Sequence, residues 1–116
     1  MPMVEANGIA QHVVIEGPAE APVVLLIHGL GWDASLWRAQ IPVLVAAGYR
    51  VVAPDLRGMG ATDKPETPYS IDLYAEDMLA LLDALGIDRV AAVGFSLGGM
   101  LVAAIAARAP ERIRAA

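Results

Sequence analysis

The feature that most limits the possible folds is a run of 18 residues, 90–107, without a charged side chain. A run of this length approaches what a helix needs to cross a bilayer. However, Gly94, Ser96, Gly98 and Gly99 interrupt its middle, with β-branched valines before them and an alanine-rich stretch after them. This pattern predicts a buried strand, a tight turn and a buried helix, and it argues against a membrane span.

Three earlier segments also have the character of strands. Residues 23–27 are continuously apolar, without alternation, which is typical of a central strand covered on both faces. Residues 50–53, Arg50-Val51-Val52-Ala53, predict another short strand. Nearer the start, Asn7-Gly8 precedes a third apolar-rich run, 9–15, and follows the apolar residues Val4 and Ala6. Asn-Gly in that position predicts a β-hairpin.

Helical spacing and helix-end signals predict three helices. Apolar residues recur at helical spacing over 71–85, Ser70 stands where an N-cap belongs, and Gly86 ends the run. Helices are also expected over 42–47 and 97–109. Strands that alternate with helices after a hairpin predict an α/β fold, in which a parallel sheet carries helices on both faces.

Charge and composition exclude several classes of function. Lys and Arg number 8 against 13 Asp and Glu, and the net charge of -5 leaves no basic face for nucleic acid. With no cysteine and only two histidines, a metal site is not expected. Residues 1–8 contain neither a basic stretch nor an apolar core of a secretory signal, so a cytoplasmic location is expected.

The segment Gly94-Phe95-Ser96-Leu97-Gly98 matches the pattern G-x-S-x-G between a predicted strand and a predicted helix. A nucleophilic Ser96 must sit on a sharp, strained turn, and Gly94 and Gly98 remove side chains that would block it. The helix that follows directs the Leu97 N–H and its positive dipole end at the site, as an oxyanion requires. The alternative is a glycine-eased turn in which Ser96 only caps the helix.

A second motif, His28-Gly29-Leu30-Gly31, follows the predicted strand 23–27, and Gly29 and Gly31 let the backbone approach a ligand. At this point the chain resembles the α/β-hydrolase superfamily. There, a His-Gly-x-Gly loop donates a second oxyanion-hole N–H, which the resemblance assigns to Leu30. Residues 54–65 look like the loop after the family's fourth strand, and the G-x-S-x-G turn looks like its nucleophile elbow.

Residues 26–37 together with 94–100 are most similar to the 3-oxoadipate enol-lactonase group, which opens a small lactone ring. A serine at position 96 argues against the dehalogenase and epoxide-hydrolase branches, which use aspartate there. Esterases, C–C bond hydrolases and cofactor-free haloperoxidases stay open. The resemblance implies a cofactor-free serine hydrolase of a small ester or lactone. Trp32 is a candidate for lining its acyl pocket, although packing is the more frequent role.

The resemblance also shows what the sequence does not contain. A triad in this fold runs from Ser to an acid to a His, but residues 97–116 offer only Glu111 and no histidine. The expectation is therefore that residues 1–116 form the N-terminal part of a single α/β-hydrolase domain. Such a piece is an incomplete fold without the C-terminal strands and cap, and it is inactive alone.

Apolar residues make up 57% of the chain, which is more apolar surface than a domain of 116 residues usually buries by itself. This excess agrees with an incomplete fold. The strand over 89–93 then becomes an exposed sheet edge, open to self-association or completion by another chain. A non-catalytic interaction module, completed by a partner chain, is the alternative function.

Other polar residues have structural interpretations. His28 is expected to have a structural part in the oxyanion loop rather than to act as the base, and His12 is expected on the surface. Asp33 suits a capping role, and Asp55 suits tying together the long surface loop predicted over 54–68, through Arg57.

A different enzyme class is suggested by residues 29–34, which satisfy the dinucleotide pattern G-x-G-x-x-[G/A], with Asp55 at the end of the next strand. Two residues argue against this interpretation. Trp32 is bulky where a pyrophosphate must approach, and Asp33 places a negative charge where phosphate would bind.

Overall fold

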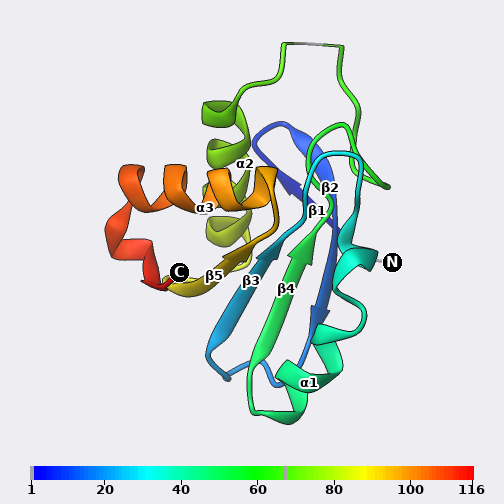
Figure 1. The fold of residues 1–116 in the computed structure, drawn as a ribbon. Helices are drawn as coiled ribbons and strands as arrows, with labels where there is room; N and C mark the ends of the chain where they lie inside the picture. Colours follow the sequence, from blue (N-terminus) through cyan, green and yellow to red (C-terminus); the bar gives the residue numbers. More distant parts are fainter. Residues whose placement is uncertain (1, 67) are drawn as a thin grey trace.

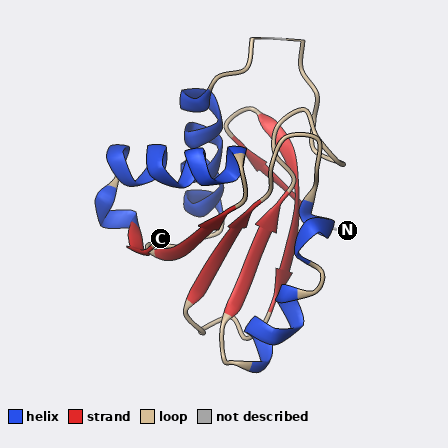
Figure 2. Cartoon of the chain, viewed as in Figure 1, coloured by secondary structure: helices blue, strands red, loops and turns tan. Residues whose placement is uncertain are grey.

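The structure is a computed structural model that describes residues 2–66 and 68–116. One mixed sheet has the strand order β1-β2-β4-β3-β5-β6 and is flanked by helices (Figures 1 and 2). Its strands are β1 (Met3–Ala6), β2 (Ile9–Glu16), β3 (Val23–Ile27), β4 (Arg50–Pro54), β5 (Val90–Gly94) and β6 (Ile113–Ala115). The helices are α1 (Gln40–Ala46), α2 (Ile71–Ala84) and α3 (Leu97–Arg108), with 3-10 turns η1 (Ala34–Trp37) and η2 (Pro110–Arg112).

The sheet confirms the predicted α/β class. β1 and β2 form the expected hairpin around Asn7-Gly8, with Ala6 opposite Ile9, and β2 pairs antiparallel with β4. The strands β4, β3, β5 and β6 are parallel neighbours. Parallel strands end at one edge of a sheet, so the segments after β3, β4 and β5 meet there, as Figure 1 shows.

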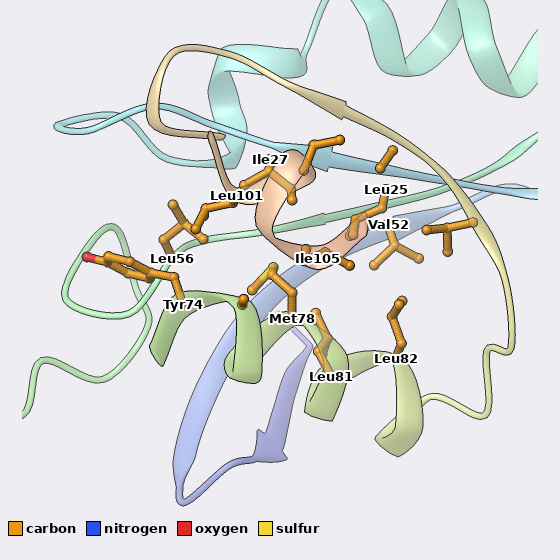
Figure 3. Close-up of a cluster of buried hydrophobic side chains, with 14 of the residues drawn as sticks. Leu25, Ile27, Val52, Leu56, Tyr74, Met78, Leu81, Leu82, Leu101 and Ile105 are labelled. Atoms are coloured by element: carbon orange, nitrogen blue, oxygen red, sulfur yellow. The ribbon is translucent and has the colours of Figure 1, made fainter. Parts of the chain in front are cut away.

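Alternating side chains of the central strands enter two separate cores, as a strand period of two requires. Leu25 and Ile27 of β3 pack with α2 and α3, against residues such as Met78 and Leu101 (Figure 3). Leu26 points to the other face. There, Val24 and Leu26 pack with Val51 and Ala53 of β4 and with Ala34, Trp37 and Ile41, from η1 and α1. The continuously apolar sequence of β3 is therefore explained by burial on both faces.

The helix predictions hold with small shifts at the ends. Ser70 caps α2, since its Oγ accepts from the Leu73 N–H at 3.1 Å, and Gly86 follows the helix with a φ of 70°. α1 starts at Gln40, two residues before the predicted start at Pro42. Pro42 fits because the N–H groups of a first turn have no intrahelical acceptor, so proline loses nothing there.

Residues 90–107 form a strand and most of a helix, as predicted. Within the described part of the chain, no helix is long and apolar enough to cross a membrane.

The end of the chain differs from expectation. The expected fold lacked the C-terminal strands, but residues 113–115 form β6, which pairs with β5 through Ile113 opposite Val90. Pro110 starts a 3-10 turn that reverses the chain, and the Arg112 guanidinium fixes this turn by donating to the Ile87 and Asp88 carbonyls. The prediction that 89–93 is an open sheet edge is therefore wrong over its first half. From Ala92 onwards, that edge of β5 has no strand partner among the described residues.

The segment 54–68 is also less exposed than predicted. Pro54 belongs to β4, and Asp55, Leu56, Arg57 and Thr62 are buried. Thr67, in the same predicted loop, and Met1, in the N-terminal segment, lie outside the described residues.

Candidate functional site

The turn between β5 and α3 has an unusual backbone at Ser96. Its φ is 57° and its ψ is -112°, outside the regions that a residue with a side chain adopts without strain. The turn is held from both sides. The Phe95 N–H donates to the Ile27 carbonyl of β3 at 3.0 Å, and the Gly99 N–H donates to the Ser96 carbonyl at 2.9 Å. The strained conformation is thus imposed by its surroundings.

Two glycines permit this turn by removing side chains from close contacts. A Cβ on Gly94 would collide with the carbonyl group of Gly98, and a Cβ on Gly98 would collide with the carbonyl oxygen of Ile27. The start of α3 therefore packs directly on the ends of β3 and β5. This contact is the close strand-to-helix approach that the G-x-S-x-G pattern predicted.

The Ser96 side chain does not cap α3. No cap hydrogen bond from its side chain to α3 is present, and within residues 2–66 and 68–116 its hydroxyl has no hydrogen-bond partner. The interpretation of Ser96 as a helix cap is therefore wrong. Ser70, by contrast, is a cap of the ordinary kind, and Ser35 donates its hydroxyl to Asp33.

The loop after β3 lies against the same turn. A Cβ built on Gly29 would be 3.0 Å from the Phe95 carbonyl oxygen and 3.2 Å from the Ser96 Cβ, so glycine suits this position. Ser96, Leu97 and Leu30 line one open hollow of about 540 Å³. In the described chain, neither the Leu30 nor the Leu97 N–H donates to another protein group. The structure thus brings together the two predicted N–H donors and the serine.

The other residues predicted for substrate binding, Gly29, Gly31 and Trp32, are not in the wall of this hollow. Gly31 has a φ of 81°, and Trp32 is 51% exposed. The hollow is walled by Leu30, Tyr69, Ser70, Ile71, Tyr74, Ser96, Leu97 and Met100. The start of α2 was not among the predicted site elements.

His28 is fully buried under the loop after β3 and has a structural part, as predicted. Its Nε2 accepts from the Leu56 N–H at 2.9 Å, so its Nδ1 carries the proton and donates to the Gly29 carbonyl at 2.7 Å. Burial lowers the pKa of His28, which favours the neutral ring. With both nitrogens occupied, His28 is not available as the base for Ser96.

His12 is buried, which contradicts its predicted surface position. Its Nδ1 lies 2.9 Å from Asp55 Oδ2, and Asp55 also accepts from the N–H groups of Ala34, at 2.7 Å, and Ala61, at 2.9 Å. Asp55 does tie the following loop together, but through His12 and the backbone rather than through Arg57. The pair lines a different depression, away from the wall around Ser96.

Arg57 instead forms a buried pair with Asp77 of α2, which sequence reasoning missed. Its guanidinium donates to both carboxylate oxygens, at 2.8 Å and 2.7 Å, and these hydrogen bonds raise the pKa of Arg57. Asn7 donates to the same carboxylate at 2.8 Å. A signal was present in the sequence. Asp77 stands three residues after Tyr74 and four before Leu81, so helical spacing places this carboxylate on the apolar stripe.

Two acidic residues take simpler positions. Asp33 caps η1 as predicted, and hydrogen bonds from Ser35 lower its pKa. Glu111, the one carboxylate after Ser96, lies beyond the far end of α3, a helix about 18 Å long at 1.5 Å per residue. It is therefore remote from the nucleophile turn.

The dinucleotide interpretation fails on the same segment. The glycines at 29 and 31 are followed by η1, a 3-10 turn of four residues, and α1 begins only at Gln40. A phosphate site needs the N-terminus of a helix directly after the glycines. Asp55 is also buried among backbone donors instead of facing a ligand.

Comparison with known proteins adds an independent observation. A model of the alpha/beta hydrolase fold matches residues 22–116. Epoxide hydrolase A of Mycobacterium tuberculosis is 43% identical over 86% of this chain and 32% of its own length. Among solved structures, an epoxide hydrolase from Vigna radiata superposes with a TM-score of 0.92 at 42% identity, over 97% of this chain and 37% of that chain.

An enol-lactonase from Burkholderia xenovorans superposes equally well, with a TM-score of 0.92 at 38% identity, over 97% of this chain and 44% of that chain. The chain spans about a third of the length of the curated relatives it matches. The partial fold seen here corresponds to the N-terminal part of such proteins, in agreement with the fold resemblance drawn from the motifs.

Proposed function

Because this chain belongs to the α/β-hydrolase fold family, we propose that residues 1–116 are the N-terminal part of a serine hydrolase that acts on a small ester or lactone. The observation that carries the proposal is Ser96, which has a strained backbone, a hydroxyl that bonds nothing in the described chain, and a place in the wall of a hollow. Strain of this kind persists where the surrounding structure imposes it, and it gathers at functional sites.

In the proposed reaction, the Ser96 oxygen attacks the carbonyl carbon of the substrate while a general base takes the hydroxyl proton. The carbonyl electron pair moves to its oxygen, which accepts hydrogen bonds from the Leu97 and Leu30 N–H groups. The tetrahedral intermediate collapses to an acyl-enzyme, and the protonated base returns the proton to the leaving alcohol. Water then attacks the carbonyl of the acyl-enzyme through the same steps and releases the acid and Ser96. In a lactone the alcohol and the acid belong to one molecule, so the product is a single hydroxy acid.

The base and its acidic partner are proposed to come from residues beyond 116. His28 has both ring nitrogens bonded within the protein, and His12 faces Asp55 in a separate depression. This arrangement supports the expectation that residues 1–116 alone have little or no activity.

The similarity to epoxide hydrolases makes epoxides the competing substrate class. Attack by a serine oxygen on an epoxide carbon would leave an ether between substrate and enzyme, and an ether has no carbonyl for water to attack. An acyl-enzyme does have that carbonyl. The serine at position 96 therefore favours carbonyl substrates.

Hydrolysis of p-nitrophenyl butyrate by the protein at its native length tests this function. The expected result is turnover that Ser96→Ala reduces by about 10³-fold or more. Ser35→Ala is the matched control, because Ser35 lies on η1 and its hydroxyl donates to Asp33, and its turnover should match the wild type. Styrene oxide should not be hydrolysed.

Three results would contradict the proposal. Full activity of Ser96→Ala would remove the nucleophile assignment, and hydrolysis of styrene oxide in place of the ester would favour the competing class. A stable protein that binds a partner chain but hydrolyses neither substrate would favour the non-catalytic interaction module.

A further inference from the structure

The wall of the hollow around Ser96 contains no charged side chain among its eight residues. Four of them are aliphatic or thioether side chains, and they surround the serine from three segments: Leu30 after β3, Ile71 on α2, and Leu97 and Met100 on α3. Met100 is 59% exposed and Leu30 is 73% exposed, so both side chains offer apolar surface at the rim. Apolar surface of this kind favours a hydrocarbon group over water.

The remaining wall residues carry hydroxyls, and three of these four hydroxyls are already engaged. Tyr69 donates to the Pro65 carbonyl at 2.8 Å, and Tyr74 donates to the Arg57 carbonyl at 3.2 Å. The Ser70 oxygen accepts from the Leu73 N–H at 3.1 Å. Of the wall hydroxyls, only that of Ser96 has no partner in the described part of the chain. The two tyrosine protons are therefore not available to a polar substituent on the substrate.

Packing fixes the two tyrosines in these roles. Their rings meet edge to face, with centroids 5.9 Å apart and planes at 79°. A Cβ on Gly58 would collide with the Tyr69 ring, so the loop after β4 packs tightly on that ring as well. Burial raises the pKa of Tyr74, which keeps its phenol neutral. The tyrosines thus form an aromatic side of the hollow, held by their mutual packing and by hydrogen bonds to the Pro65 and Arg57 carbonyls.

A carboxylate on the substrate would have no cation to meet in this wall. The guanidinium of Arg57, the residue whose carbonyl holds the Tyr74 hydroxyl, is paired with Asp77 through both oxygens. The chain as a whole carries a net charge of -5, which repels anions. Moving an ionised carboxylate from water to an apolar wall without a partner is costly.

We propose that this wall selects an uncharged hydrocarbon group, so that the substrates are neutral alkyl or arylalkyl esters or lactones without a free carboxylate. The inference rests on the proposed function, since it assumes that the substrate carbonyl lies at Ser96. It assigns Met100, Leu30 and Tyr69 as residues that determine specificity.

Binding of two unreactive ketones with the same skeleton tests the inference without requiring catalysis. The probes are 2-octanone and 7-oxooctanoate, which adds a terminal carboxylate, and calorimetry gives their Kd values for Ser96→Ala at native length and pH 7.5. The expected result is that 2-octanone binds about tenfold more tightly or better, a difference of about 1.4 kcal/mol. Equal or tighter binding of 7-oxooctanoate would overturn the inference, and so would no binding of either ketone.

A pair of lysine variants locates the selectivity. Met100→Lys puts a cation at the rim of the hollow and is expected to improve binding of 7-oxooctanoate relative to 2-octanone by about tenfold. Val43→Lys is the matched control, because Val43 is 68% exposed on α1, away from this wall, and should leave the ratio unchanged. An equal change in both variants would mean that overall charge, and not the wall, sets the preference.

The ketone measurements test the further inference and the ester assay tests the proposed function, so each can be contradicted without the other. Selective ketone binding without Ser96-dependent ester turnover would contradict the proposed function and leave the apolar wall in place. Ser96-dependent turnover with no preference between the ketones would contradict only the further inference.

Discussion

Two turns in the described part of the chain hold a residue other than glycine at positive φ, and they do so for different reasons. Asn7 has a φ of 53° and Ser96 has a φ of 57°. Asn7 precedes Gly8 in a two-residue hairpin, a position where asparagine is common. Its side chain also donates to Asp77 at 2.8 Å. Ser96 is in a strand-to-helix turn with a ψ of -112°, and its side chain bonds nothing in the described chain.

The strained backbone at Asn7 is accompanied by a side-chain contact that stabilises the fold, whereas the strained backbone at Ser96 is not. The hairpin needs a left-handed backbone, and the asparagine side chain adds a contact to the core. At position 96, glycine would satisfy the backbone better, and no structural contact compensates for the serine. A side chain retained at such a position points to chemistry rather than folding.

The largest expected effect concerns the carboxylate that supports the hairpin. Asp77→Ala removes the buried partner of Arg57 and of the Asn7 side chain, and should lower the free energy of unfolding by about 3 to 5 kcal/mol. Urea unfolding of the native-length protein measures this loss. Asp72→Ala, an exposed acid on the same helix, should change it by less than about 0.5 kcal/mol. Similar losses in both variants would mean that the buried pair has no special role.

The next largest effect is a difference in stability between alanine substitutions at the glycines beside the two turns, Gly98 and Gly8. Gly98→Ala forces a Cβ onto the Ile27 carbonyl oxygen and should cost about 3 kcal/mol, since the neighbouring backbone cannot move aside cheaply. Gly8→Ala meets no atom within 4 Å, so only its positive φ opposes the change, at about 1 kcal/mol. Thermal unfolding of both variants gives the order. A reversed order would contradict the close packing of α3 on β3.

Glycine substitutions at the two strained residues should have opposite signs. Ser96→Gly relieves backbone strain and should raise the free energy of unfolding by about 1 kcal/mol while abolishing ester turnover. Asn7→Gly also relieves strain but loses the hydrogen bond to Asp77, so it should lower that free energy by about 1 kcal/mol. Both values come from urea unfolding at pH 7.5. Stabilisation by both substitutions would remove the distinction between the turns.

The last expected effect is a pH dependence from His28, whose carbonyl oxygen is part of the close contact around Gly98. Burial lowers the pKa of His28 in the folded protein below 6.5, so the unfolded chain binds more protons just below that pH. Its contribution to stability is therefore complete above pH 6.5 and decreases as the pH falls towards the folded pKa. The slope is at most about 1.4 kcal/mol per pH unit.

Urea unfolding between pH 7.5 and 5.5 measures this slope. His28→Asn should be less stable at pH 7.5 but should show a flatter pH dependence than the wild type. Equal slopes would mean that His28 is protonated as easily in the folded protein as in the unfolded chain.

Sequence reasoning succeeded where local rules act. The apolar runs, the Asn7-Gly8 turn, the Ser70 cap and the G-x-S-x-G turn depend on neighbouring residues, and each lies where it was expected. The family resemblance assigned Leu30 to the same site as Ser96, and both residues line one hollow.

It failed where distant residues decide the outcome. His12 lies on a strand that looked half exposed, and only the fold shows that it meets Asp55, 43 positions later. Arg57 was assigned to the wrong acid because its true partner lies 20 residues away on α2. The strand β6 has three residues, too few for a periodic signal, and it depends on Arg112 reaching back to the turn before β5.

Ser96 is proposed as the nucleophile, and it should therefore differ in reactivity from the other serines of residues 1–116. Labelling the native-length protein with a fluorophosphonate, followed by mass spectrometry of its peptides, tests this claim within one molecule. The chain offers two internal controls, Ser35 and Ser70, whose hydroxyls are engaged with Asp33 and with the start of α2. A single adduct on Ser96 is predicted. An adduct on Ser35 or Ser70, or none on Ser96, would contradict the account.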